Sequence, residues 1–130
     1  MGKQIVRTIY VLLMCCILVG CSKKELSLGT LMEATDFTNI QVVDGNTGNL
    51  IILDIEQTDE LYEKLKDIEA TRDKSSKHHT GWSYAITFVY GSKEVDGFLI
   101  VGDNKISYHN YFYKDLNPSI DKEYLESLFE

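Results

Sequence analysis

Three histidines, His78, His79 and His109, are the side chains best suited to bind a metal or to transfer protons near neutral pH. Zinc could be held by imidazole and carboxylate ligands together, but His78 and His79 are adjacent in a polar segment and have no partner at helical spacing. His109 stands between a predicted strand and Asn110, which favours a hydrogen-bonded residue at the rim of a sheet. We therefore predict no metal site and no cofactor.

The segment Asp44-Gly45-Asn46-Thr47-Gly48-Asn49 contains oxygen ligands like those that open a calcium-binding loop. However, Gly48 and Asn49 stand in the reverse of the required order, and Ile55 occupies the position of the bidentate glutamate. Asp, Asn and Gly are also the residues that form tight turns. The segment is therefore predicted to be the turn of a β-hairpin.

Residues for covalent or acid–base catalysis are sparse. The sequence contains no Gly-x-Ser-x-Gly motif, and its cysteines, Cys15, Cys16 and Cys21, all lie in the first 21 residues. Asp54 and Glu56 form a carboxylate pair, which we interpret as a solvated strand end. The prediction is a protein that is not an enzyme. The alternative is a small cell-envelope enzyme that uses carboxylates and His109 and requires a pocket to gather them.

Aromatic residues are concentrated in the second half of the chain, and most of them are needed for a core. Tyr rings with polar tips also suit recognition of a protein, peptide or glycan. Tyr111 and Tyr113 share one face of a strand and leave Phe112 on the other. The predicted partner-binding surface consists of Trp82, Tyr108, His109, Tyr111 and Tyr113.

The elements that would position these residues follow from periodicity. Apolar and polar residues alternate from Trp82 to Tyr90, which predicts a strand with Trp82, Tyr84, Ile86, Phe88 and Tyr90 on one face. Turn residues then separate strands at 95–101, 106–109 and 111–113, which indicates an antiparallel meander. A hairpin over 40–55 precedes this meander.

Two helices are predicted. The first has Thr58 or Asp59 as its N-cap and an apolar stripe of Leu61, Leu65 and Ile68, and the second places Pro118 at its first position. Residues 70–81 are predicted to be a loop. The predicted fold is α+β, an antiparallel sheet with two helices on one face in the order β-β-α-β-β-β-α.

The first residues of the chain have the pattern of an export signal. Lys3 and Arg7 precede an apolar run over 9–19 that is too short to span a membrane. The run ends in Leu18-Val19-Gly20-Cys21, which resembles the lipobox of bacterial lipoproteins. This resemblance implies transfer of a diacylglyceryl group to Cys21 and cleavage after Gly20. The mature part resembles small uncharacterised lipoproteins of Gram-positive bacteria, to which no activity is assigned.

The predicted organisation is a lipoprotein signal peptide (1–20), a lipidated Cys21 with a polar tether (21–36), and one domain (37–130). The chain carries 13 Lys and Arg and 20 Asp and Glu residues; without Lys3 and Arg7 the balance becomes 11 to 20, or −9. Such an acidic chain with scattered cations is unsuited to nucleic acid.

These features together predict a lipoprotein anchored to the cell membrane and facing its extracytoplasmic side. Two acyl chains on Cys21 give stable anchoring without a transmembrane helix. The predicted role is a non-catalytic binding or accessory module. Besides the enzyme, a second alternative is an inhibitor or immunity-type protein whose acidic surface meets a basic partner.

Overall fold

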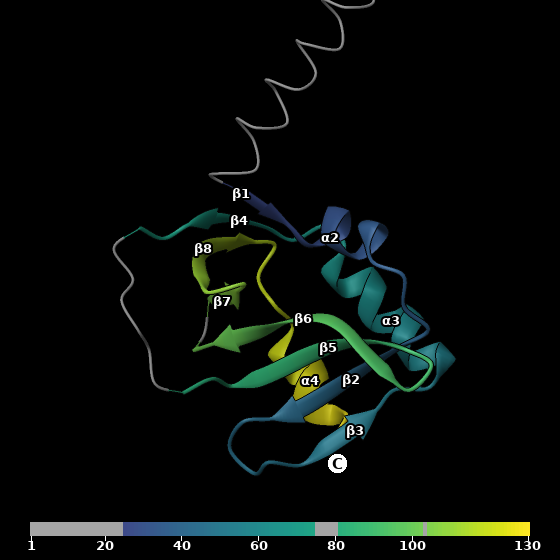
Figure 1. The fold of residues 1–130 in the computed structure, drawn as a ribbon. Helices are drawn as coiled ribbons and strands as arrows, with labels where there is room; N and C mark the ends of the chain where they lie inside the picture. The colour runs from purple at the N-terminus through teal and green to yellow at the C-terminus, as the bar shows by residue number, and fades with distance from the viewer. Residues whose placement is uncertain (1–24, 75–80, 103) are drawn as a thin grey trace, which may run out of the picture.

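The computed structural model describes residues 25–74, 81–102 and 104–130. Within these ranges the chain forms eight strands and three helices. All strands belong to one antiparallel sheet with the order β1-β4-β8-β7-β6-β5-β2-β3 (Figure 1). The α+β class with an antiparallel sheet is confirmed, but the predicted order of elements is not matched: the chain has one more helix, and Glu25–Ser27 and Glu69–Arg72 are strands that were not predicted.

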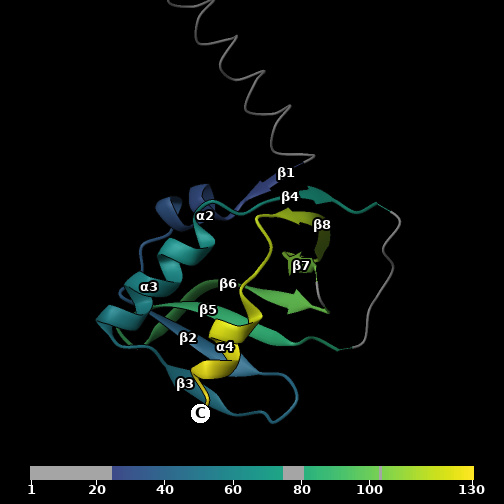
Figure 2. The same cartoon turned by 180° about the vertical axis from the view of Figure 1, so that it is seen from behind.

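The bounds of the strands are β1 Glu25–Ser27, β2 Asn39–Asp44, β3 Leu50–Ile52, β4 Glu69–Arg72, β5 Tyr84–Tyr90, β6 Lys93–Val101, β7 Lys105–Tyr108 and β8 Tyr111–Asn117. The helices are α2 Leu28–Ala34, α3 Ile55–Leu65 and α4 Lys122–Ser127. Seen from behind, α3 and α4 lie in front of the strands (Figure 2).

One face of the sheet carries the core. Tyr84, Ile86 and Phe88 of β5 are buried in alternation, as predicted, and Phe88 has no exposed surface. Beyond Phe88 the register against β6 shifts, because β6 holds an extra residue there, Val95. Val89 is buried and Tyr90 is 56% exposed, so the alternation of burial along β5 ends at Phe88.

All three helices contribute to the same core cluster, through Met32 of α2, Leu65 of α3 and Leu125 of α4. The three described helices therefore lie on one face of the sheet, and none of them covers the opposite face of the central strands. We call this the open face and define it by the outward, half-buried side chains of β2, β5, β6 and β7, namely Gln41, Val43, Ala85, Thr87, Leu99 and Ser107.

The predicted tether over 21–36 is wrong for its described part. Leu26 lies in β1, which pairs with β4, and Leu28 and Met32 of α2 are buried. The apolar residues in this polar stretch are spaced so that a short strand and one helical face can insert them into the core. Ala70 of β4 is buried beside them, so the start of the predicted 70–81 loop is also a strand.

Both predicted helix starts are also wrong. Asp54 caps α3 by accepting from the Gln57 N–H at 2.8 Å, while Gln57 Oε1 accepts from the Asp54 N–H at 3.1 Å. This reciprocal capping box begins the helix before Thr58 and ends β3 at Ile52. Likewise Asp121, rather than Pro118, begins α4 by accepting from the Tyr124 N–H at 3.1 Å.

Some predictions fall outside the described residues: the signal peptide over 1–20, the lipid-bearing Cys21, and His78 and His79 in segment 75–80. Across the parts of the chain that are described, none of the helices has the length and apolar character needed to cross a bilayer.

Candidate functional site

The predicted aromatic segment forms a tight hairpin between β7 and β8. Tyr108 and Tyr111 are paired across it, and the two residues between them have positive φ, 48° at His109 and 69° at Asn110. Two successive residues of this kind form the type I′ turn that suits the twist of a hairpin. The turn therefore explains Asn110 and presents the His109 ring, which is 64% exposed.

Asp96 of β6 connects this turn to the neighbouring hairpin. Its Oδ2 accepts from the Tyr108 hydroxyl at 2.7 Å, and its Oδ1 lies 2.9 Å from His109 Nε2. The Gly97 N–H also donates to Oδ1 at 2.9 Å, and the rings of Tyr108 and His109 stack with centroids 3.9 Å apart. One carboxylate thus fixes the position of both rings.

This geometry changes the acidity of the two central groups. Burial favours the neutral carboxyl, but the Tyr108 hydroxyl, His109 and the Gly97 N–H stabilise the carboxylate more, so the pKa of Asp96 falls below its usual value. Burial raises the pKa of Tyr108 strongly, and the hydrogen bond to Asp96 adds to this effect. Asp96 is therefore an anion and Tyr108 a neutral donor.

Asp96 should make the stability of the domain dependent on acid pH. A carboxyl whose pKa is lower in the folded state stabilises the fold above its unfolded pKa of about 3.9, and this contribution is lost as pH falls through the folded value. The difference in free energy of unfolding between wild type and Asp96→Asn should shrink from about pH 6 to pH 2, measured by urea unfolding.

The exposed Asp36→Asn variant controls for the change in net charge. A difference between wild type and Asp96→Asn that stayed constant over this pH range would show that the folded state does not prefer the ionised carboxylate.

The remaining predicted partner-binding residues do not form one surface. Tyr113 is 8% exposed and belongs to the core, so the prediction that it is accessible is wrong. Tyr111 is 48% exposed, and the Arg72 guanidinium lies 3.9 Å from its ring centroid. Trp82 precedes β5 beside Gly45, two strands away from the β7–β8 hairpin. Only Tyr108, His109 and Tyr111 lie together.

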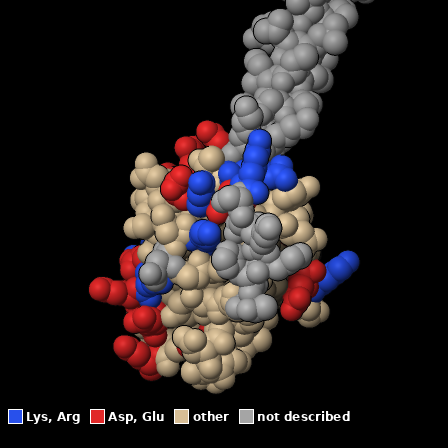
Figure 3. All heavy atoms as spheres, turned by 90° about the vertical axis from the view of Figure 1, so that its left-hand side faces the viewer, with Lys and Arg blue, Asp and Glu red and all other residues tan. Residues whose placement is uncertain are grey.

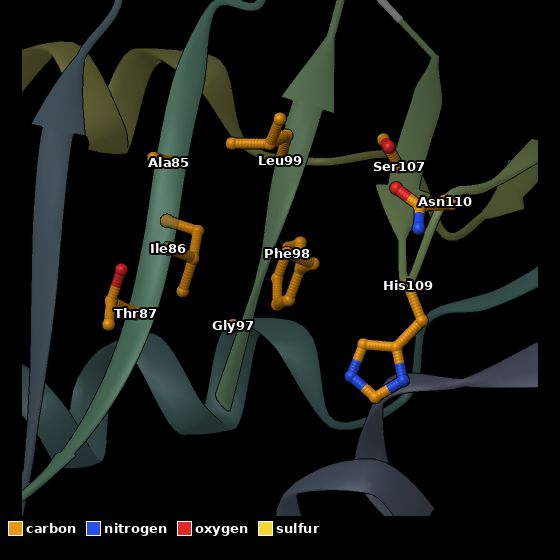
Figure 4. A pocket seen from close by; sticks show the side chains of 9 residues that line it. All are labelled: Ala85, Ile86, Thr87, Gly97, Phe98, Leu99, Ser107, His109 and Asn110. Carbon is orange, nitrogen blue, oxygen red and sulfur yellow. The ribbon is translucent and has the colours of Figure 1, made fainter. Parts of the chain in front are cut away.

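A shallow hollow of about 270 Å³ lies beside this turn. Figure 4 shows that its lining comes from three neighbouring strands, β5, β6 and β7, with His109 at one end. Gly97 deepens the hollow because it has no side chain, and a Cβ there would lie 2.5 Å from the Ile86 carbonyl oxygen. Thr87, Leu99 and Ser107 of the open face surround it.

The polar groups around the hollow include the His109 imidazole and the hydroxyls of Thr87 and Ser107. His109 and Asp96 form a pair. Among the described residues, the hydroxyls of Thr87 and Ser107 line the hollow but make no hydrogen bond to His109, which would be needed to activate either of them as a nucleophile. Among the residues that the structure places, no three His, Cys, Asp or Glu side chains gather as metal ligands. The hollow offers hydroxyls, an imidazole and apolar surface for contact.

The sequence interpretation missed Asp96 and the residues of the open face. Two signals were present: Asp is disfavoured inside a strand, and Gly97 beside it is typical of a bulge or a close backbone contact. Pairing between Asp96 and the later hairpin could not be derived from spacing alone.

Comparison with known proteins adds no relative: the chain matches no protein-family model, no curated protein and no solved structure.

Proposed function

We propose that this protein is a lipoprotein, anchored through Cys21 on the extracytoplasmic side of the cell membrane, whose domain is a non-catalytic binding module. The anchoring part is supported by Leu18-Val19-Gly20-Cys21 after a short apolar run. The binding part is supported by one structural observation: none of the described helices covers the open face, whose six defining side chains are uncharged and half-buried.

The position of β1 at one edge of the sheet is compatible with such an anchor. The described chain begins at β1, an edge strand, so a tether from Cys21 would attach at that end of the sheet. Cationic side chains of β4, β7 and β8 lie near this end, and Figure 3 shows Lys and Arg beside Asp and Glu in the upper part of the face. Cations near the anchor would be attracted to anionic headgroups.

The open face is unusual for so acidic a chain. Its six defining residues carry no charge, and Lys105 of β7 lies on the same face two residues before Ser107, whereas the chain as a whole has a net charge of −7. A mostly uncharged surface with a hollow and a few hydrogen-bonding groups is typical of a contact surface for protein, peptide or glycan. His109 and Tyr108, held by Asp96, would form the polar margin of that surface.

Site-specific crosslinking in membranes tests this proposal. A photo-crosslinking residue at Thr87 should give a discrete adduct with a partner, whereas one at the exposed Glu123 of α4, on the helical side, should not. Leu99→Lys should reduce the Thr87 adduct about tenfold, because an unpaired charge in a desolvated contact costs at least ~1.4 kcal/mol.

Val95→Lys is the matched control, since Val95 is 43% exposed on the same strand and lies outside the hollow. Equal adducts from Thr87 and Glu123, or equal losses in the two lysine variants, would contradict a binding role for the open face.

The enzyme alternative has one observation in its favour, the His109–Asp96 pair beside the hollow. The inhibitor or immunity-type alternative is favoured by the excess of acidic residues, 20 against 13 basic ones. We rank both below the binding module. For the enzyme, no described residue forms an activated nucleophile beside His109 and Asp96, and the inhibitor or immunity-type protein is a special case of partner binding.

A further inference from the structure

The strand β3 forms an unpaired edge of the sheet. It has β2 as its sole neighbour among the described strands and lies at the opposite end of the strand order from β1 (Figures 1 and 2). Between β2 and β3, the Asp44 N–H donates to the Asn49 carbonyl oxygen, and the Leu53 N–H donates to the Ile40 carbonyl oxygen. In an antiparallel ladder such bonds alternate. The peptide groups of Leu50 and Ile52 therefore face outward from the sheet.

This edge also exposes apolar side chains. Leu50 is 54% exposed, Ile52 is 63% exposed, and Ile55 at the start of α3 is 73% exposed. Proteins usually protect a free edge with Lys, Pro or a bulge, and segment 49–53 contains no proline and no charge. Free peptide groups beside apolar side chains are the features by which a sheet accepts an additional strand from a partner.

The charge around the edge selects the kind of partner. Residues 44–56, from the end of β2 through β3 to the first turn of α3, contain three acidic residues, Asp44, Asp54 and Glu56, and no Lys or Arg. Asp44 faces Tyr84 across β2 and β5. Asp54 and Glu56, which follow β3 in the chain, are both exposed.

We infer that β3 binds an extended segment of a cationic partner, which adds to the sheet as a further strand. Its apolar side chains would contact Leu50 and Ile52, and its basic side chains would lie among the carboxylates of Asp44, Asp54 and Glu56. A second copy of this chain fits less well, because two acidic edges would repel each other. The inference rests on the proposed binding function. It adds that the partner is cationic and that it binds at the β3 edge of the sheet.

Two synthetic peptides test the inference with the full chain purified in detergent. The acetylated, amidated peptide Lys-Val-Lys-Val-Lys-Val-Lys should bind, whereas its counterpart with Glu in place of every Lys should not. Ile52→Pro should weaken binding of the cationic peptide about tenfold, because proline removes one outward N–H without breaking the bonds to β2. Ile52→Val keeps that N–H and is the matched control.

Titration calorimetry measures these affinities, and thermal unfolding shows whether Ile52→Pro is folded. If the Ile52→Pro variant is unfolded, the Ile52→Lys variant replaces it. The added positive charge should weaken binding of the cationic peptide by a similar factor. Equal binding of the two peptides, binding that Ile52→Pro leaves unchanged, or an Ile52-dependent homodimer in sedimentation would each overturn the inference. Loss of peptide binding with an intact Thr87 adduct would reject this edge and leave the proposed function standing.

Discussion

A chain in which Cys21 is replaced by Ala is expected to lack the lipid anchor and to accumulate as the uncleaved precursor. The Cys21 thiol is the proposed acceptor of the diacylglyceryl group, and no other group at that position can form the thioether. Each buried methylene of an acyl chain contributes about 0.8 kcal/mol to membrane binding, so losing two chains removes stable anchoring. Cell fractionation and intact-mass analysis measure both effects.

Cys16→Ala is the matched control, because it removes a cysteine from the same apolar segment and leaves Leu18-Val19-Gly20-Cys21 intact. This variant should be lipidated and retained like the wild type. A processed wild-type chain that carried a free Cys21 thiol would contradict the lipoprotein proposal, while the binding proposals for the domain would be unaffected.

The central meander could be predicted because its signals are local. Alternation over Tyr84–Phe88 defines the inward face, and glycine turns at 91 and 102 separate strands that then pair with their sequence neighbours. The hairpin at 44–49 was predicted for the same reason, and Asp44 Oδ1 accepts from the Asn46 N–H as expected of a turn.

The elements that could not be predicted depend on distant partners. Glu25–Ser27 forms a strand because β4 pairs with it, and the Leu28 N–H donates to the Ile68 carbonyl oxygen at 3.0 Å. Three apolar residues in a polar stretch do not reveal such pairing. The start of α3 was missed for a different reason: Asp54 and Gln57 form a capping box that the sequence did contain.

The candidate site was predicted in part. The break predicted at Asn110 between two strands is the turn between β7 and β8, but Tyr113 pairs with Ile106 and shares its buried face. The carboxylate that organises the turn, Asp96, comes from the preceding hairpin. A single sequence does not show which of many acidic residues will meet a given tyrosine, since that depends on strand register.

Phe88→Ala is expected to give the largest loss of stability in the domain. Phe88 has no exposed surface, and its ring centroid lies 5.0 Å from that of Phe37 and 6.1 Å from that of Phe98. Truncation of a buried Phe removes these contacts and leaves a cavity, which costs about 3–5 kcal/mol. The total stability of a small domain is about 5–15 kcal/mol, so a large fraction would be lost.

Urea unfolding followed by the fluorescence of Trp82, the single tryptophan, measures this change in the free energy of unfolding. Tyr90→Ala is the matched control, since Tyr90 lies on the same strand beyond the bulge and is 56% exposed. It should cost much less, because its ring is already largely hydrated in the folded state. Equal losses in the two variants would mean that the strand does not turn Phe88 inward, and the assignment of the open face to Thr87 and Leu99 would fail with it.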